Sequence, residues 1–281
     1  MNHKKLNEFI EKCIQEDIQD GDHTSICCIT ENKKGTANII SKQNATVAGV
    51  ELAKKIFNYY DDNLKIETIK IDGEKVFIGD VILKITGKIR SILAMERLVL
   101  NCMQRMSGIA TKTKKIKKLI AKFDVKILDT RKTTPNIRFL EKWAVKIGGG
   151  INHRMGLYDT ILIKDNHIDY SKGISYSIEQ AINYSKKVKN VPIIVEVRTL
   201  EELKSIMRFK ELTRIILDNF SIEKIKEAVQ IANNEIPLEI SGNINENNIK
   251  NYASTGVDYI SIGALTHSAQ NIDMSLKAEV S

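Results

Sequence analysis

The fold of this chain is decided by a pattern first met in residues 125–135, VKILDTRKTTP. Ile127 and Leu128 lie in an apolar run that predicts a buried strand. The run ends abruptly in an acid, a hydroxyl and two cations, Asp129, Thr130, Arg131 and Lys132. Two adjacent cations at the end of a buried strand form either an ordinary solvated turn or a binding site for an anion.

Apolar runs of this kind recur along the rest of the chain. They cover residues 125–129, 160–164, 192–197, 214–218, 237–241 and 258–263. Amphipathic segments separate them, near residues 136–147, 176–188, 200–209, 221–233 and 246–254. Strands that alternate with helices run parallel, because each connection is a long crossover. Two architectures remain open, a doubly wound open sheet and an incomplete α/β barrel.

Polar or small residues end every one of these runs. They are Asp129 with Arg131 and Lys132, then Lys164, Glu196, Asp218, Ser241 with Gly242, and Gly263 before Thr266 and His267. In a barrel the carboxyl ends of the strands converge on one mouth, whereas an open sheet spreads them along an edge. Ordinary polar loops explain one or two such ends more easily than all of them. The pattern therefore favours the barrel.

The residues up to about 105 follow a mixed pattern. Apolar residues at helical spacing near the N-terminus predict an amphipathic helix. Strand-like runs follow at residues 35–43, 45–50, 64–71 and 80–87, with one helix near 50–60 and another that begins near Ser91. This mixture indicates an α+β domain.

The formal net charge of +8 raises the question of a nucleic-acid partner. The lysines, however, alternate with Glu, Ile and Asn, and few aromatic side chains lie among them to stack on bases. An enzyme that attracts small anions is a better use of this charge. The four cysteines contain no C-x-x-C pair, and no apolar run is long enough for a signal peptide or a membrane span. We therefore expect a cytoplasmic protein with reduced cysteines that binds neither nucleic acid nor a membrane.

The strand ends divide into groups with different chemistry. The cations are Arg131, Lys132, His153, Arg154 and Lys164. They could hold two carboxylates or a phosphate. Glu196 and Asp218 could hold a divalent cation or sugar hydroxyls, and the small residues at 241–243 and 263–264 suit a phosphate. A substrate with carboxylates and another with a sugar, a phosphate and a metal ion would use every part.

Eight motifs resemble, in order, those of the quinolinate phosphoribosyltransferase family. They are ERLVLN, SGIAT, DTRKTTP, EKWAVKIGGGINHR, LIKDNH, LDN, EISGNI and TGVDYISIGALTHS. The resemblance covers nearly the whole chain. It implies an N-terminal α/β sandwich domain and an incomplete α/β (TIM-like) barrel. We place the first at residues 1–106 and the second at 107–281, with a last helix that packs back on the first domain.

The resemblance implies a pentosyltransferase, the carboxylating nicotinate-nucleotide diphosphorylase. Such an enzyme transfers the phosphoribosyl group of phosphoribosyl pyrophosphate to quinolinate with loss of CO₂. It yields nicotinate mononucleotide and pyrophosphate, in NAD biosynthesis, with Mg²⁺ as the cofactor. It also implies a homodimer or larger assembly in which a neighbouring subunit completes each active site.

Roles for individual side chains follow from the same resemblance. The two carboxylates of quinolinate would be bound by Arg131, His153, Arg154 and Lys164. Lys132 would bridge toward phosphoribosyl pyrophosphate, and Arg97, in ERLVLN, would reach in from the partner subunit.

On the sugar side, Glu196 and Asp218 would face the ribose and Mg²⁺. The 5′-phosphate would lie against Ser241, Gly242, Asn243, Ile262, Gly263 and Ala264. Thr130 and His267 would lie next to the substrates. The candidates for catalysis are Lys132, Lys164, Glu196 and Asp218.

One departure from the family pattern concerns Arg198. The family usually reads Glu-Val-Glu where this chain reads Glu196-Val197-Arg198. In a continuing strand Glu196 and Arg198 share a face. Arg198 then either turns away and pairs with Glu196 or Asp218, or contacts a phosphate directly.

Other functions remain open at this point. Lys164 or Lys132 could form the Schiff base of an aldolase on a similar barrel. A paralogous branch associated with molybdenum transport shares the fold, although DTRKTTP and NHR are closer to the quinolinate branch. A non-catalytic module that binds anions or nucleic acid is a further alternative.

Overall fold

The structure is a computed structural model that describes residues 3–279. The described residues form two compact units, one from the residues up to 112 with those from 269 onward, and the other from residues 113–268. The division falls a few residues after the boundary expected from the sequence, and the final segment belongs to the first unit. No helix in the described part of the chain is long and apolar enough to cross a membrane.

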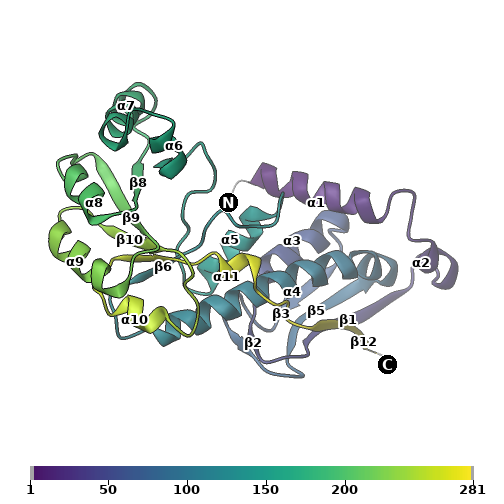
Figure 1. Ribbon diagram of the computed structural model, residues 1–281. Coiled ribbons are helices and arrows are strands. Elements are labelled where there is room, and N and C mark those ends of the chain that lie inside the picture. The colour runs from purple at the N-terminus through teal and green to yellow at the C-terminus, as the bar shows by residue number, and fades with distance from the viewer. Residues whose placement is uncertain (1–2, 280–281) are drawn as a thin grey trace. The chain divides into compact units, whose positions relative to one another are not determined.

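The first unit is built on an antiparallel sheet of four strands in the order β12-β1-β5-β3 (Figure 1). In chain order its elements are α1 (His3–Asp17), α2 (His23–Cys28), β1 (Lys34–Ser41), β2 (Ala45–Thr46), α3 (Val50–Tyr60), β3 (Lys65–Thr68), β4 (Lys75–Val76), β5 (Val81–Lys88), α4 (Ile89–Leu119, which continues into the second unit) and β12 (Met274–Glu279). Alternate residues of β1 are buried, and Ile56 and Phe57 of α3 are fully buried. Helices and a one-sided sheet share this core, as in an α/β sandwich.

The expected last helix is wrong, because residues 274–279 form strand β12. β12 pairs antiparallel with β1, and Leu276 lies opposite Ile39. Met, Leu, Lys, Ala and Glu are good helix formers, so local propensity favours a helix here. Pairing with an edge of the sheet outweighs that preference, since propensity is weak against tertiary contacts.

The segment before β12 lies directly against helix α4. The backbone N–H of Ile272 donates to the carbonyl of Gln104 at 3.1 Å. A Cβ atom added at Gly108 would lie 2.0 Å from the carbonyl oxygen of Gln270. Only a glycine lets the two backbones approach this closely.

Gly108→Ala is expected to destabilise the first unit by about 1–3 kcal/mol, because the new methyl group meets rigid backbone. The helix propensity of alanine offsets about 1 kcal/mol of the steric cost. Urea denaturation would measure the change. Asn101→Ala, at an exposed position of the same helix, is the control and should change stability little. Equal stabilities for Gly108→Ala and the parent would contradict the close approach.

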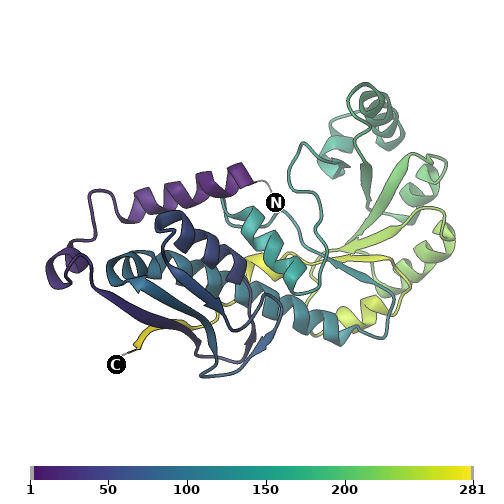
Figure 2. The ribbon, with the colours of Figure 1, turned by 180° about the vertical axis from the view of Figure 1, so that it is seen from behind.

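The second unit is built on a parallel sheet of six strands in the order β6-β11-β10-β9-β8-β7. In chain order its elements are β6 (Lys126–Leu128), α5 (Arg138–Ile147), β7 (Ile161–Ile163), α6 (Asp165–Asp169), α7 (Ile174–Lys187), β8 (Ile193–Val197), α8 (Leu200–Ile206), β9 (Leu212–Asp218), α9 (Ile222–Ala232), β10 (Leu238–Ser241), α10 (Ile249–Ala253), β11 (Tyr259–Ser261) and α11 (Ala264–His267). Every residue of β8 is buried. Helices α7 to α10 lie outside the sheet (Figures 1 and 2), as expected for parallel strands covered on both faces.

The six expected strands and the five helices between them are all confirmed. Within the described residues β6 and β7 are not paired with each other, so the barrel is incomplete. The sequence did not indicate the short helices α6 and α11, which begin directly after strand ends. All six strands point their carboxyl ends to the same side of the sheet, because they are parallel.

Candidate active site

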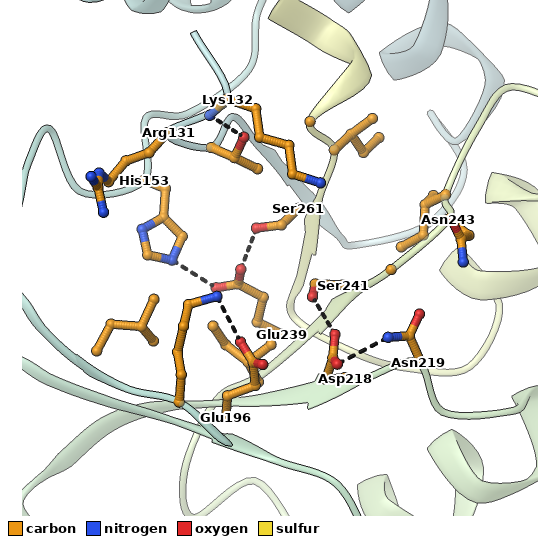
Figure 3. A pocket seen from close by; sticks show the side chains of 18 of the residues that line it. Arg131, Lys132, His153, Glu196, Asp218, Asn219, Glu239, Ser241, Asn243 and Ser261 are labelled. Carbon is orange, nitrogen blue, oxygen red and sulfur yellow. Dashed lines mark hydrogen bonds and ion pairs between the residues drawn. The ribbon is translucent and has the colours of Figure 1, made fainter. Parts of the chain in front are cut away.

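A cavity of about 1010 Å³ lies at the carboxyl ends of the six parallel strands (Figure 3). It brings together every site residue that the sequence predicted within the second unit. These residues are Thr130, Arg131, Lys132, His153, Arg154, Lys164, Glu196, Asp218, Ser241, Gly242, Asn243, Ile262, Gly263, Ala264 and His267. The strand ends therefore converge, as a barrel requires. Arg97 is the exception: it is exposed on α4 and does not line this cavity.

Two guanidinium groups form the cationic side of the cavity. Arg154 donates from Nη1 to the carbonyl of Thr160 at 3.1 Å. Burial lowers the pKa of Arg154, and the positive charge of Arg131 lowers it further, while Asp159 opposes this. In the described structure Arg131 and Lys132 have no carboxylate within ion-pair distance. Like charges held together in this way favour a ligand that carries more than one negative charge.

Acidic side chains lie on β8 and β9. Glu196 is 8% exposed, and its Oε2 atom lies 3.2 Å from Nζ of Lys164. Burial raises the pKa of Glu196; Lys164 opposes this, and the charge of Asp218 adds to it. Asp218 accepts hydrogen bonds from Oγ of Ser241 at 3.2 Å and from Nδ2 of Asn219 at 2.9 Å (Figure 3). The cavity is thus cationic at one end and acidic next to it.

Glu196 and Asp218 are the acids of this cavity that could hold a divalent cation. In the part of the chain that the structure describes, no group of three or more His, Cys, Asp and Glu side chains could hold a metal ion. Mg²⁺, however, usually keeps several waters and binds through one or two carboxylates together with substrate phosphates. Glu196 and Asp218 present carboxylate oxygens from the adjacent strands β8 and β9. These two carboxylates fit a Mg²⁺ ion that is also bound by the phosphates of a substrate.

Small residues after β10 leave backbone open to the cavity. Gly242 has a φ of 102° and Asn243 a φ of 49°, a left-handed region that glycine and asparagine adopt most readily. A Cβ atom at Gly242 would lie 2.1 Å from Oδ1 of Asn219. The turn therefore requires glycine for both its conformation and its space.

The Arg131-Lys132 loop is held by helix α11 and by Gly263, which directly precedes it. Oγ1 of Thr266, on α11, donates to the carbonyl of Lys132 at 2.7 Å. The side chain of Lys132 also packs against Gly263, where an added Cβ atom would come within 2.9 Å of its Cδ. Nδ1 of His267 lies 2.6 Å from Oγ of Ser268. The short helix α11 thus fixes the position of Lys132.

A buried ion pair supports the loops that carry the cations. Lys142, on α5, and Asp129 are both fully buried and form an ion pair. The carboxylate of Asp129 also accepts from Nδ2 of Asn152 at 2.5 Å and from the backbone N–H of His153 at 2.9 Å. Burial raises the pKa of Asp129 and lowers that of Lys142, and each charge partly offsets the shift of the other. The pair ties the end of β6 to the loop of His153 and Arg154.

Glu239 was not among the predicted site residues. It lies on β10 at the base of the cavity and is 1% exposed. An acid inside the apolar run PLEIS was the available signal, because a buried carboxylate needs partners. Asn219 and Ser261 also line the cavity without having been predicted.

Arg198 has neither of the ion-pair partners expected from the sequence. It is exposed, follows the end of β8 and does not line the cavity. Its Nη1 donates to both carboxylate oxygens of Asp169, at 3.0 and 3.1 Å, and its Nη2 donates to Glu202 at 3.0 Å. Of the two alternatives left open by the sequence, the pairing with Glu196 or Asp218 is therefore wrong, and the position outside the cavity also disfavours a direct contact of Arg198 with a phosphate bound there. β8 ends at Val197, so the alternation that would have aimed Arg198 inward stops one residue earlier.

Arg198→Glu is expected to leave turnover within about tenfold of the parent, because Arg198 does not line the cavity. Its exposed ion pairs also contribute little to the stability of the fold. The substitution places a third acid next to Asp169 and Glu202, so hydrogen exchange over residues 165–169 should become faster. Lys204→Glu, which disturbs an exposed pair with Glu227, is the control. Complete loss of activity without loss of thermal stability would assign Arg198 a direct role.

Family comparisons point to one enzyme class. Residues 22–107 match the sequence model of the quinolinate phosphoribosyl transferase N-terminal domain, and residues 109–277 match that of its C-terminal domain. The chain is 41% identical to the chloroplastic nicotinate-nucleotide pyrophosphorylase (carboxylating) of Oryza sativa subsp. japonica, over 98% of this chain and 78% of that protein. It is 37% identical to a probable nicotinate-nucleotide pyrophosphorylase (carboxylating) of Bacillus subtilis, over 100% of this chain and 96% of that one.

Solved structures agree with the sequence comparisons. The nicotinate-nucleotide pyrophosphorylase of Francisella tularensis superposes with a TM-score of 0.92 at 40% identity, covering 99% of this chain and 98% of that one. The enzyme of the same name from Pyrococcus furiosus superposes with a TM-score of 0.68 at 18% identity, covering 99% and 78%. The second likeness shows the fold alone.

Proposed function

We infer, from the premise that this chain belongs to the quinolinate phosphoribosyltransferase family, that it transfers the phosphoribosyl group of phosphoribosyl pyrophosphate to quinolinate. The products are nicotinate mononucleotide, pyrophosphate and CO₂, and the reaction serves NAD biosynthesis. The observation that carries this inference is one cavity with two mutually repelling guanidiniums at one end and two acids at the other. A dicarboxylate and a sugar phosphate would fill both ends.

Quinolinate would bind at the cationic end. Its two neighbouring carboxylates match the forks of Arg131 and Arg154, and Lys164 adds a third charge. Lys164 also contacts Glu196, so it lies between the subsite for the pyridine ring and the subsite for the ribose. This contact supports a role for Lys164 in aligning the ring nitrogen with the anomeric carbon.

Phosphoribosyl pyrophosphate would bind at the acidic end. Glu196 and Asp218 would face the ribose, and the backbone at 241–243 and 262–264 would receive the 5′-phosphate. Lys132, with Thr130 and His267 near it, would meet the pyrophosphate. Mg²⁺, when bound with this substrate at Glu196 and Asp218, would offset charge on the pyrophosphate.

The chemistry needs orientation and electrostatics more than covalent catalysis. As pyrophosphate departs, the anomeric carbon gains positive character, which the carboxylates of Glu196 and Asp218 stabilise. The ring nitrogen of quinolinate attacks that carbon and becomes a pyridinium. The electron-poor ring then accepts the electron pair of the adjacent C–CO₂ bond, CO₂ leaves, and a proton from water binds to the same ring carbon to give nicotinate mononucleotide. Arg154 and Arg131 hold the other carboxylate throughout.

A direct assay tests the inference. The protein is mixed with quinolinate, phosphoribosyl pyrophosphate and Mg²⁺, and nicotinate mononucleotide and CO₂ are measured. Nicotinate replaces quinolinate in a control reaction, and a chelator replaces Mg²⁺ in another. We expect turnover only in the complete mixture. Trapping of a carbonyl substrate on Lys164 by borohydride, without mononucleotide formation, would instead indicate an aldolase.

We also propose a cytoplasmic homodimer, or a larger assembly, in which Arg97 of the partner subunit completes the cavity. The support is the exposed position of Arg97 on α4 and the cationic character of the quinolinate end. Mixing inactive Arg97→Ala with inactive Lys164→Ala should restore part of the activity, because mixed dimers contain one intact site. No recovery after subunit exchange would contradict a shared site.

A further inference from the structure

A buried polar cluster lies at the base of the cavity around Glu239. Nη1 of Arg214, on β9, donates to Oε2 of Glu239 at 2.6 Å, and Ser261, on β11, donates to its other oxygen. Nε2 of His153 lies 3.5 Å from Oε2. Figure 3 shows His153 and Ser261 both directed at this carboxylate. One side chain thus links three structural elements of the cavity wall.

The carboxylate of Glu239 is held in its charged form. Burial by itself raises its pKa, but His153, Arg214 and Ser261 together lower the pKa below its ordinary value. The guanidinium of Arg214 also lies 3.9 Å from the ring of Tyr259, which keeps it in place. A fixed negative charge therefore faces the ring of His153.

Both ring nitrogens of His153 are engaged within the protein. Nδ1 accepts a hydrogen bond from the backbone N–H of Arg154 at 2.7 Å, so this nitrogen carries no proton. Nε2 then carries the proton and points it at Glu239. The side chain of His153 is only 9% exposed. A histidine in this arrangement has no donor left for a substrate carboxylate.

We propose that Glu239 is a positioning residue that fixes the tautomer and orientation of His153, and through His153 the place of Arg154 in the dicarboxylate subsite. This rests on the proposed function, and it changes the part of His153 from a ligand of quinolinate to a support for Arg154. The arrangement follows a general rule for imidazoles, in which the partner of one nitrogen sets the role of the other.

Substitution by the neutral isostere is the kinetic test. Glu239→Gln should raise KM for quinolinate by about 10- to 100-fold, because Arg154 loses its alignment. KM for phosphoribosyl pyrophosphate should change little. Glu227→Gln, at an exposed acid of α9, is the matched control. Equal increases in both KM values would mean that Glu239 is merely structural and would overturn the proposal.

Nuclear magnetic resonance of the parent protein tests the same proposal without any variant and without turnover. The chain has five histidines, so ¹⁵N-histidine labelling resolves them, and His153→Gln assigns the signal. We expect His153 protonated on Nε2 alone, both free and with the unreactive dicarboxylate phthalate. Protonation on Nδ1, or a switch of tautomer on adding phthalate, would overturn the proposal. A parent that forms no mononucleotide would refute the proposed function and leave this measurement interpretable.

Discussion

Lys142→Met is expected to lower the free energy of unfolding by about 3–5 kcal/mol, the usual cost of breaking a buried ion pair. Asp129 would remain buried with Asn152 and the N–H of His153 as partners, but its charge would lose its cation. Urea denaturation would measure the effect. Lys146→Met, on the same helix but exposed, is the control and should change stability little.

The dependence of this loss on pH follows from the sign of the pKa shift. The folded-state pKa of Asp129 is already raised, and removal of Lys142 removes a charge that opposes the rise. A raised carboxylate pKa means that the folded state binds more protons than the unfolded state, so stability increases as pH falls through that pKa. The loss in free energy of unfolding caused by Lys142→Met should therefore become smaller at acidic pH. Adding Asp129→Asn to the Lys142→Met chain should restore part of the lost free energy. A deficit that is independent of pH would contradict this account.

Arg154→Met is expected to reduce kcat/KM for quinolinate by a factor that corresponds to about 2–5 kcal/mol of binding. Its guanidinium lines the same cavity as Arg131 and is acted on by the charge of Arg131, and no acid of the described chain lies within ion-pair distance of Arg131. The substrate carboxylates would supply that neutralisation. Initial rates at varied quinolinate concentration would measure the effect, with KM for phosphoribosyl pyrophosphate little altered.

Arg208→Met is the control for this prediction, because Arg208 is an exposed arginine beside Phe209 and does not line the cavity. It should have the kinetics of the parent. If Arg154→Met raised both KM values equally, Arg154 would support the cavity as a whole rather than one substrate.

The barrel and most of its site could be predicted because the relevant signals are local. The apolar run PIIVEV predicts a buried parallel strand, and Glu196, next to the last residue of that strand, then lies near the common mouth. Once the strands are parallel, the positions of Lys164 and Asp218 follow without further information.

The remaining features depend on contacts between residues distant in the sequence. Residues 274–279 have helical propensity, and only the free edge of β1 makes them a strand. Arg198 pairs with Asp169, 29 residues earlier, whereas strand alternation predicted Glu196 or Asp218, which are nearer to it in the sequence. Glu239 was missed for the same reason, since the partners that allow its burial lie on other elements, distant in the sequence.

Strand β12 also constrains how the protein can be made. During translation β1, β3 and β5 are synthesised first, and residues 274–279 are synthesised only after the whole barrel. Until then the edge of β1 has no partner, and an unpaired edge can recruit other chains. Nascent copies on one messenger are therefore exposed to mispairing for the time that translation of the barrel takes.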